Sequence, residues 1–223
     1  MSYFNKKTKI TASVIGVLLG LASILNHGIF EILQGSTLTN GFYIEAIGEE
    51  HRFWIHGTEG AFTIIHNFLI TGILVLAIGV IIVIWSLRYI HVKNGTKVFL
   101  GLLILVTLVG GGIGHILLYL PTWALATRIN KSLDWWKNMM PVRLRSILSS
   151  LWKYSLLATS ISWLILMELG IFGYFPGQTD PDIILKIVYG FLFSSSILAC
   201  LTFICAFAGD IENRIHDEVS STN

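Results

Sequence analysis

Long runs of apolar residues occupy most of this chain and are separated by short polar connections. Four of the runs are long enough for a helix to cross about 30 Å of hydrocarbon, which takes roughly 20 residues. These four runs are Ile10–Leu33, Ala61–Leu87, Leu151–Phe175 and Ile183–Ala208. A fifth run, Val98–Ile129, is also long but is broken near its middle. The pattern predicts an all-α protein, a polytopic helical membrane bundle in which residues 1–223 form one integral membrane domain.

The composition agrees with a membrane location. Of the 223 residues, 54% are hydrophobic and only 13% are charged, and this charged share is about half that of a typical soluble domain. The formal net charge is +2, so the chain has no strong basic field that would attract nucleic acid. The lipid bilayer is therefore the predicted partner, and no nucleic acid partner is expected.

The third long run is interrupted by a cluster of glycines, Gly110, Gly111, Gly112 and Gly114. Each glycine weakens a helix by roughly 1 kcal/mol relative to alanine and tolerates the backbone angles of a tight bend. We therefore predict a hinge at these glycines and a re-entrant hairpin, which enters the membrane and returns to the same side. The alternative is a tilted helix that crosses the membrane and uses the glycines as a packing face.

The positions of Lys and Arg predict the orientation, because these residues favour the cytoplasmic side of a membrane. If the third segment is re-entrant, every Lys and Arg except Arg52 and Lys186 lies on one side. That side then includes both termini and the basic loop 130–150, while the loop 34–60 lies outside. The sequence thus predicts a multi-pass protein of the cell membrane with both termini in the cytoplasm.

Several ionisable or polar residues lie inside or beside the apolar runs. A charge in lipid is costly, so such residues normally face the interior of a bundle and are functional. With a helical rise of about 1.5 Å per residue, most of them fall in the outer half of the membrane. The candidates for binding a ligand, a proton or a metal are His27, Glu31, Glu59, His66, Asn67, His115 and Glu168.

Imidazole and carboxylate groups together can bind a proton, a cation or a divalent metal such as zinc or iron. In a metal site, the expected ligands are His27, His66 and His115. Haem is a less favoured alternative, in which buried histidines on facing helices would be the axial ligands. The chain contains no H-E-x-x-H motif, so no motif specifies the chemistry.

Three kinds of function remain open from the sequence. A glycine-broken helix with intramembrane carboxylates and histidines suits a small transporter coupled to protons or cations. A metal or a haem at the same residues would instead make a membrane enzyme. In an accessory or assembly subunit, the polar network would only hold the helices together. For Glu168, the structural alternative to a functional role is an ion pair with Lys186. A homo-oligomer or a larger membrane complex is a further expected partner.

Overall fold

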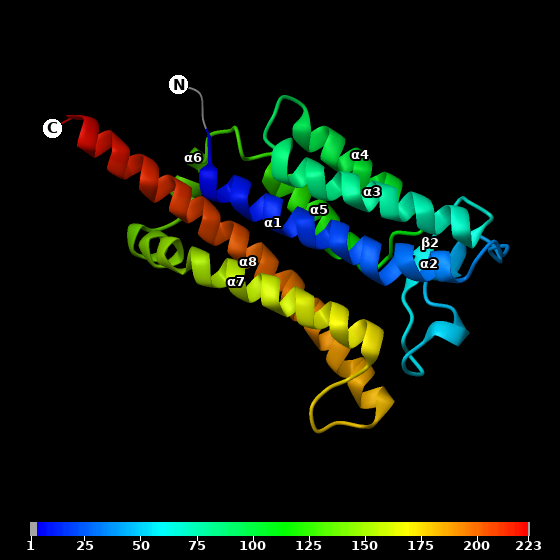
Figure 1. Cartoon of the computed structure of the whole chain (residues 1–223). Helices are drawn as coiled ribbons and strands as arrows, with labels where there is room; N and C mark the ends of the chain where they lie inside the picture. The colour runs from blue at the N-terminus through cyan, green and yellow to red at the C-terminus, as the bar shows by residue number, and fades with distance from the viewer. Residues whose placement is uncertain (1–3, 223) are drawn as a thin grey trace.

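The computed structural model describes residues 4–222, and helices account for nearly all of its regular structure. In this range, four helical segments are long and apolar enough to cross a membrane (Figure 1). The first is the continuous run of α1 (Lys6–Ala22), the π-helical turn η1 (Ser23–Gly28) and α2 (Ile29–Leu33), and the others are α3 (Phe68–Arg88), α7 (Val142–Phe172) and α8 (Pro181–Thr222). A short 3-10 helix, η2 (Glu49–His51), lies in the loop between α2 and α3. The predicted helical fold and its four candidate spans are confirmed.

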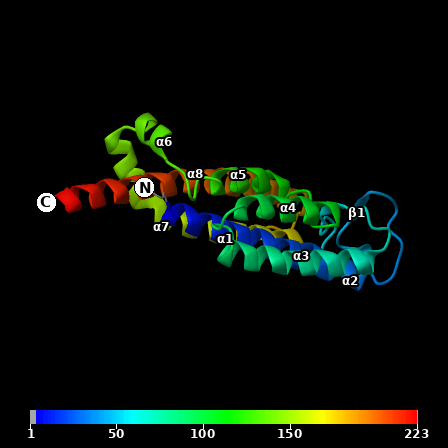
Figure 2. The ribbon, with the colours of Figure 1, turned by 90° about the horizontal axis from the view of Figure 1, so that it is seen from above.

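The long helices run nearly parallel to one axis (Figure 2). The central helix is α1, which contacts α3, α5 (Ile116–Ala126), α7 and α8. The last two helices, α7 and α8, pack against each other, and two hydroxyl pairs join them. Thr159 and Thr202 are 2.8 Å apart, and Ser162 and Ser195 are 2.6 Å apart. Such pairs satisfy polar side chains between helices in apolar surroundings.

The first helical segment and α3 approach each other closely at a pair of glycines. A β-carbon at Gly72 of α3 would lie 2.7 Å from the carbonyl oxygen of Gly28. Small residues of this kind allow the backbones of two membrane helices to come together. The contact holds the last turns of the first segment, which include His27, against α3.

The broken third segment forms two short helices joined by a glycine-rich turn. The first is α4 (Gly95–Leu108), the turn covers residues 109–115, and the second is α5. In the turn, Gly110 and Gly112 have φ angles of +117° and +95°, which glycine adopts readily and other residues do not. The chain therefore bends at the predicted hinge instead of continuing as one helix.

Both ends of the α4–α5 hairpin lie at the same end of the bundle. After α5, the Asn130 side chain donates to the carbonyl oxygen of His91 at 2.7 Å. The backbone N–H of Asn5 donates to the carbonyl oxygen of Ile129 at 2.8 Å. Arg214 of α8 donates to the side-chain oxygen of Asn5 at 2.7 Å. The start of α1, both ends of the hairpin and the last turns of α8 thus meet opposite the loop between α2 and α3 (Figure 1).

The second long helix begins at Phe68 and not at Ala61, which corrects its predicted start. The residues before it form β2 (Gly60–Phe62), which pairs antiparallel with β1 (Tyr43–Glu45). The helix begins only after Asn67, whose side-chain oxygen accepts a backbone N–H of the first turn. A short apolar run is compatible with a strand or with a helix. An N-cap residue such as Asn67 marks the position at which the helix begins.

The segment predicted as a basic loop is largely helical. It contains α6 (Asp134–Met139), and α7 begins at Val142, earlier than the predicted Leu151. In these additional turns of α7, the buried Arg145 forms an ion pair with Glu212 of α8. Pairing with an acidic partner lets a charged residue occupy the interface between two helices, so α7 continues along α8 beyond its apolar run.

Candidate metal centre

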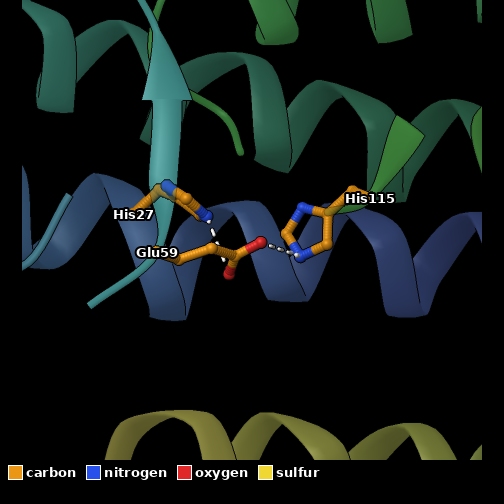
Figure 3. A group of neighbouring side chains, drawn as sticks. All are labelled: His27, Glu59 and His115. Atoms are coloured by element: carbon orange, nitrogen blue, oxygen red, sulfur yellow. Dashed lines mark ion pairs between the residues drawn. The ribbon is translucent and has the colours of Figure 1, made fainter. Parts of the chain in front are cut away.

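Three side chains from distant parts of the sequence meet near the end of the bundle that carries the strands (Figure 3). His27 comes from η1, Glu59 from the residue before β2, and His115 from the start of α5. The Oε2 atom of Glu59 lies 3.1 Å from Nε2 of His27, and its Oε1 atom lies 3.9 Å from Nε2 of His115. One ligand atom from each residue lies within 4.8 Å of the other two. The carboxylate thus sits between two imidazoles.

His27 is completely buried and belongs to a π-turn. In this turn the N–H of Ile29 bonds to the carbonyl oxygen of Ile24, five residues earlier, and such single turns occur frequently at functional sites. The Nε2 atom of His27 approaches Glu59 without the alignment of a hydrogen bond, and its Nδ1 atom has no hydrogen-bond partner in residues 4–222. A buried ring with two unpaired nitrogens calls for an explanation, and a bound ligand is one.

His115 is oriented by the glycine turn. Its Nδ1 atom lies 3.1 Å from the carbonyl oxygen of Gly111. A carbonyl oxygen only accepts hydrogen bonds, so Nδ1 carries the proton in this contact. In the neutral ring the lone pair is then on Nε2, which faces Glu59. Histidines that bind metals are commonly fixed in this way, with the second ring nitrogen bonded to a backbone carbonyl.

Glu59 remains ionised in this environment. Burial acts to raise the pKa of its carboxyl group, but nearby His115 and His27 and a hydrogen bond from the Gly114 backbone outweigh burial and lower the pKa to about 2. The side chain keeps 29% of its surface exposed. The site therefore presents a negative charge between two imidazoles, and it remains accessible.

The glycine turn also forms the wall behind these side chains. A β-carbon at Gly112 would lie 2.4 Å from Nε2 of His27, and one at Gly114 would lie 2.8 Å from Oε1 of Glu59. Real β-carbons do not approach other atoms so closely, so the turn leaves room for the site only because it is made of glycine. The predicted hinge residues thus bend the chain and shape the site.

Glu31 lies against the same turn but outside the group of three. Its side chain is completely buried, and a β-carbon at Gly110 would lie 2.6 Å from its Oε1 atom. Neither carboxyl oxygen has a hydrogen-bond partner in the described part of the chain. Because an isolated charge is costly in such surroundings, Glu31 is a second polar feature of this region, distinct from the group around Glu59.

The structure does not bring His66 into the site. The residue is exposed in the loop before α3, because the helix that was predicted to carry it starts only at Phe68. The neighbouring Asn67 caps α3 and donates to the Ser36 hydroxyl at 3.1 Å. Of the predicted candidates, Glu59 and not His66 lies beside His27 and His115.

Glu168 also lies apart from the site. It is exposed on α7, and Lys186 is exposed on α8. Among the ion pairs found in residues 4–222, none joins these two side chains. The ion pair considered from the sequence is therefore not formed within the described chain.

A cavity of about 330 Å³ adjoins the three converging residues. Glu59 and His115 line one side, and apolar side chains of α7 and α8 line the other. Asn26 and Trp163 also line it, and their buried Oδ1 and Nε1 atoms have no hydrogen-bond partner among the described residues. Sequence reasoning missed both residues, because nothing in a hydrophobic run indicates which amide or indole will face a cavity.

No protein-family model matches the chain, and no curated protein or solved structure shows significant similarity to it. The function is therefore argued from the site itself.

Proposed function

We propose that this chain is an integral membrane protein that binds one divalent transition metal, with zinc as the best fit. The ligands are Nε2 of His27, a carboxylate oxygen of Glu59 and Nε2 of His115. The observation that carries the proposal is the convergence of one ligand atom from each of these residues within 4.8 Å. Two imidazoles and one carboxylate, with a fourth position left open, make up a recurring catalytic zinc site.

The distances support a metal at this position. A zinc ion with bonds of about 2.1 Å needs ligand atoms roughly 3.4 Å apart in tetrahedral geometry. The separations between Glu59 and the two imidazoles, 3.1 Å to His27 and 3.9 Å to His115, bracket that value. The ion would also satisfy Nε2 of His27, which has no aligned hydrogen bond within residues 4–222. Haem fits less well, because the Glu59 carboxylate occupies the space between the imidazoles that the macrocycle would need.

The open coordination position favours an enzyme over the other functions considered. Three protein ligands leave one position for water or substrate, and the adjoining cavity gives that position access to a small molecule. A metal in such a site supplies a Lewis acid and an activated water when bound. We therefore propose a metal-dependent membrane enzyme. A transporter of protons or cations is the second candidate, and the observation that favours it is the buried carboxyl of Glu31, unpaired within the described residues.

We further propose that α4 and α5 form a re-entrant hairpin, with both termini and residues 130–150 in the cytoplasm. The contacts of Asn130 with His91 and of Asn5 with Ile129 support it, since they put both ends of the hairpin beside the start of α1. The test is cysteine labelling from outside the cell, in a chain whose own two cysteines are replaced.

In the labelling test, Glu50→Cys in the outer loop is expected to react in intact cells. Lys131→Cys is expected to react only after the membrane is made permeable. Both side chains are exposed in the structure, so a difference between them reports the side of the membrane. Reaction of Lys131→Cys in intact cells would overturn the hairpin topology.

The metal proposal is tested by elemental analysis of protein purified in mild detergent without a chelator. We expect about one zinc per chain, as one three-ligand site predicts. His27→Ala and Glu59→Gln are expected to lose it, because each removes a ligand. Two controls make the same changes elsewhere: His66→Ala at an exposed histidine, and Glu31→Gln at a glutamate outside the group. Equal zinc in wild type and His27→Ala would refute the site.

A further inference from the structure

The cavity beside the proposed metal has a polar end and an apolar end. At the polar end, His115 and Glu59 are joined by Asn26 and Thr58. His56 also lines the cavity, where it pairs with Asp182 at the start of α8. The apolar end lies between α7 and α8 and is lined by Leu166, Met167, Leu185, Val188 and Leu192. A cavity with this division fits a molecule that is itself polar at one end and apolar at the other.

Two residues that line the cavity, Asn26 and Trp163, each have a buried polar atom without a hydrogen-bond partner in residues 4–222. The Oδ1 atom of Asn26 accepts hydrogen bonds, and the Nε1–H of Trp163 donates them. Their residues are 7% and 2% exposed, and neither atom has a partner in residues 4–222. Buried polar groups are almost always hydrogen-bonded, and neither residue is a proposed metal ligand. Both residues line the cavity, so a ligand head with a donor and an acceptor is one partner that they would take.

Free space lies beside Gly170 of α7. A β-carbon at Gly170 of α7, which lines the cavity, would meet no atom within 4 Å. At the rim, Tyr43 and Tyr189 are 58% and 53% exposed, so the cavity is open to its surroundings near the outer ends of α7 and α8. Tyrosine is frequent where apolar and aqueous regions meet, because its ring is apolar and its hydroxyl is polar. A chain entering here would lie alongside lipid.

We propose that the cavity binds a single-chain amphiphile, whose oxygen-bearing head reaches the metal while its hydrocarbon chain lies between α7 and α8. The inference rests on the proposed metal site and names its substrate class. The volume of about 330 Å³ is at the lower end of the range for small-molecule sites, so it takes one chain and not a whole two-chain lipid.

The test uses the full-length protein in detergent with cobalt in place of zinc. Cobalt has a visible absorption spectrum that changes when a ligand joins the metal. The probes are alkyl hydroxamates, which share one metal-binding head and differ only in chain length, from acetohydroxamate to octanoylhydroxamate. Each is titrated into wild type while the cobalt spectrum is recorded.

Wild type is expected to bind the octanoyl probe about tenfold more tightly than acetohydroxamate. Transfer of the chain from water to an apolar site would tighten binding by roughly fourfold for each methylene. The expected total gain is much smaller, because detergent competes with the protein for the chain. Gly170→Leu fills the apolar end and is expected to remove the gain while acetohydroxamate binds as before. Gly190→Leu is the matched control, because a β-carbon at Gly190 also meets no atom within 4 Å and Gly190 is outside the cavity lining.

The outcomes separate the two proposals. If wild type takes up no cobalt, the metal site fails and this inference fails with it. If cobalt binds and both probes bind equally tightly, the metal site stands and the amphiphile is overturned. The amphiphile is also overturned if Gly170→Leu and Gly190→Leu reduce the chain-length gain equally, since the chain would then lie outside the cavity.

Discussion

The backbone of Gly112 lies directly against the imidazole of His27, so close that a β-carbon at position 112 would be 2.4 Å from Nε2. Its φ of +95° is also one that other residues rarely adopt. Gly112→Ala is therefore expected to push His27 away from Glu59 and to weaken metal binding by about tenfold or more, the usual effect of disturbing a supporting contact. Isothermal titration with zinc measures this change.

The matched control for that substitution is Gly101→Ala in α4. A β-carbon at Gly101 would meet no atom within 4 Å, and alanine favours a helix over glycine by roughly 1 kcal/mol. Zinc affinity should be unchanged in this variant, with equal or slightly higher thermal stability. If Gly112→Ala bound zinc as tightly as Gly101→Ala, the turn would not be shaping the site.

The π-turn that carries His27 gives a second prediction. One inserted residue converts an α-helical turn into a π-turn, so deletion of Leu25, which is 40% exposed, should restore an α-helix between α1 and α2. His27 would then point elsewhere, while the flanking helices keep their packing. We expect zinc binding to be lost and helical content by circular dichroism to be preserved.

Leu25→Ala serves as the control for the deletion, because it removes the same side chain and leaves the number of residues unchanged. Zinc binding should persist in this variant. Loss of zinc in both variants would mean that the leucine side chain, and not the π-turn, supports the site.

The hydrophobic runs predicted the helices well, because about 20 consecutive apolar residues have few other stable arrangements. They failed at the start of α3. Ala61 and Phe62 are apolar, but they belong to β2, which pairs with β1 from the same loop, and only the capping residue Asn67 marks the true start locally. The displaced helix is also why His66 was wrongly grouped with His27.

The site could be predicted only in part for a similar reason. Depth along ideal helices placed His27 in the outer half of the membrane and, with a re-entrant hairpin, His115 near its middle, since a helix rises by a fixed distance per residue. Depth does not show in which direction a side chain points around its helix. Glu59, moreover, comes from a loop whose path depends on the β1–β2 pairing. The π-turn and the place of Asn26 and Trp163 in the cavity lining depend on tertiary packing, which hydrophobic periodicity does not encode.

Asp210 of α8 gives a prediction about stability. Its carboxylate accepts the backbone N–H groups of Lys7 and Thr8, each at 2.8 Å, and the Thr8 hydroxyl at 2.7 Å. It therefore caps the start of α1 from another helix. Asp210→Ala leaves these donors unsatisfied at a buried position, which should lower the free energy of unfolding by about 1–3 kcal/mol.

Thermal unfolding in detergent measures the effect of Asp210→Ala. The control is Asp217→Ala, at an exposed aspartate on the same helix, where the melting temperature should hardly change. Equal melting temperatures for the two variants would show that the interhelical cap contributes nothing. Zinc binding should be retained in both, since neither residue is near the site.

Metal binding should depend on pH through the histidines and not through Glu59. Protons compete with the metal for its imidazole ligands, because a histidine binds a metal only in its neutral form. The pKa of Glu59 is lowered to about 2, so this ligand stays ionised throughout. Zinc affinity should therefore fall as the pH is lowered from about 7.5, as equilibrium dialysis would measure. A zinc affinity that stays constant between about pH 7.5 and pH 5 would contradict histidine ligation.

The metal-free protein should respond to acid in a separate pH window. A carboxyl whose pKa is lower in the folded state stabilises the fold fully above its unfolded value, and this contribution is lost as pH falls toward the folded value. For the pKa of Glu59 these limits are 4.5 and about 2. The melting temperature of wild type should thus fall more steeply below pH 4.5 than that of Glu59→Gln, which has no such proton to bind. Parallel curves for the two proteins would mean that the anion between the imidazoles does not stabilise the fold.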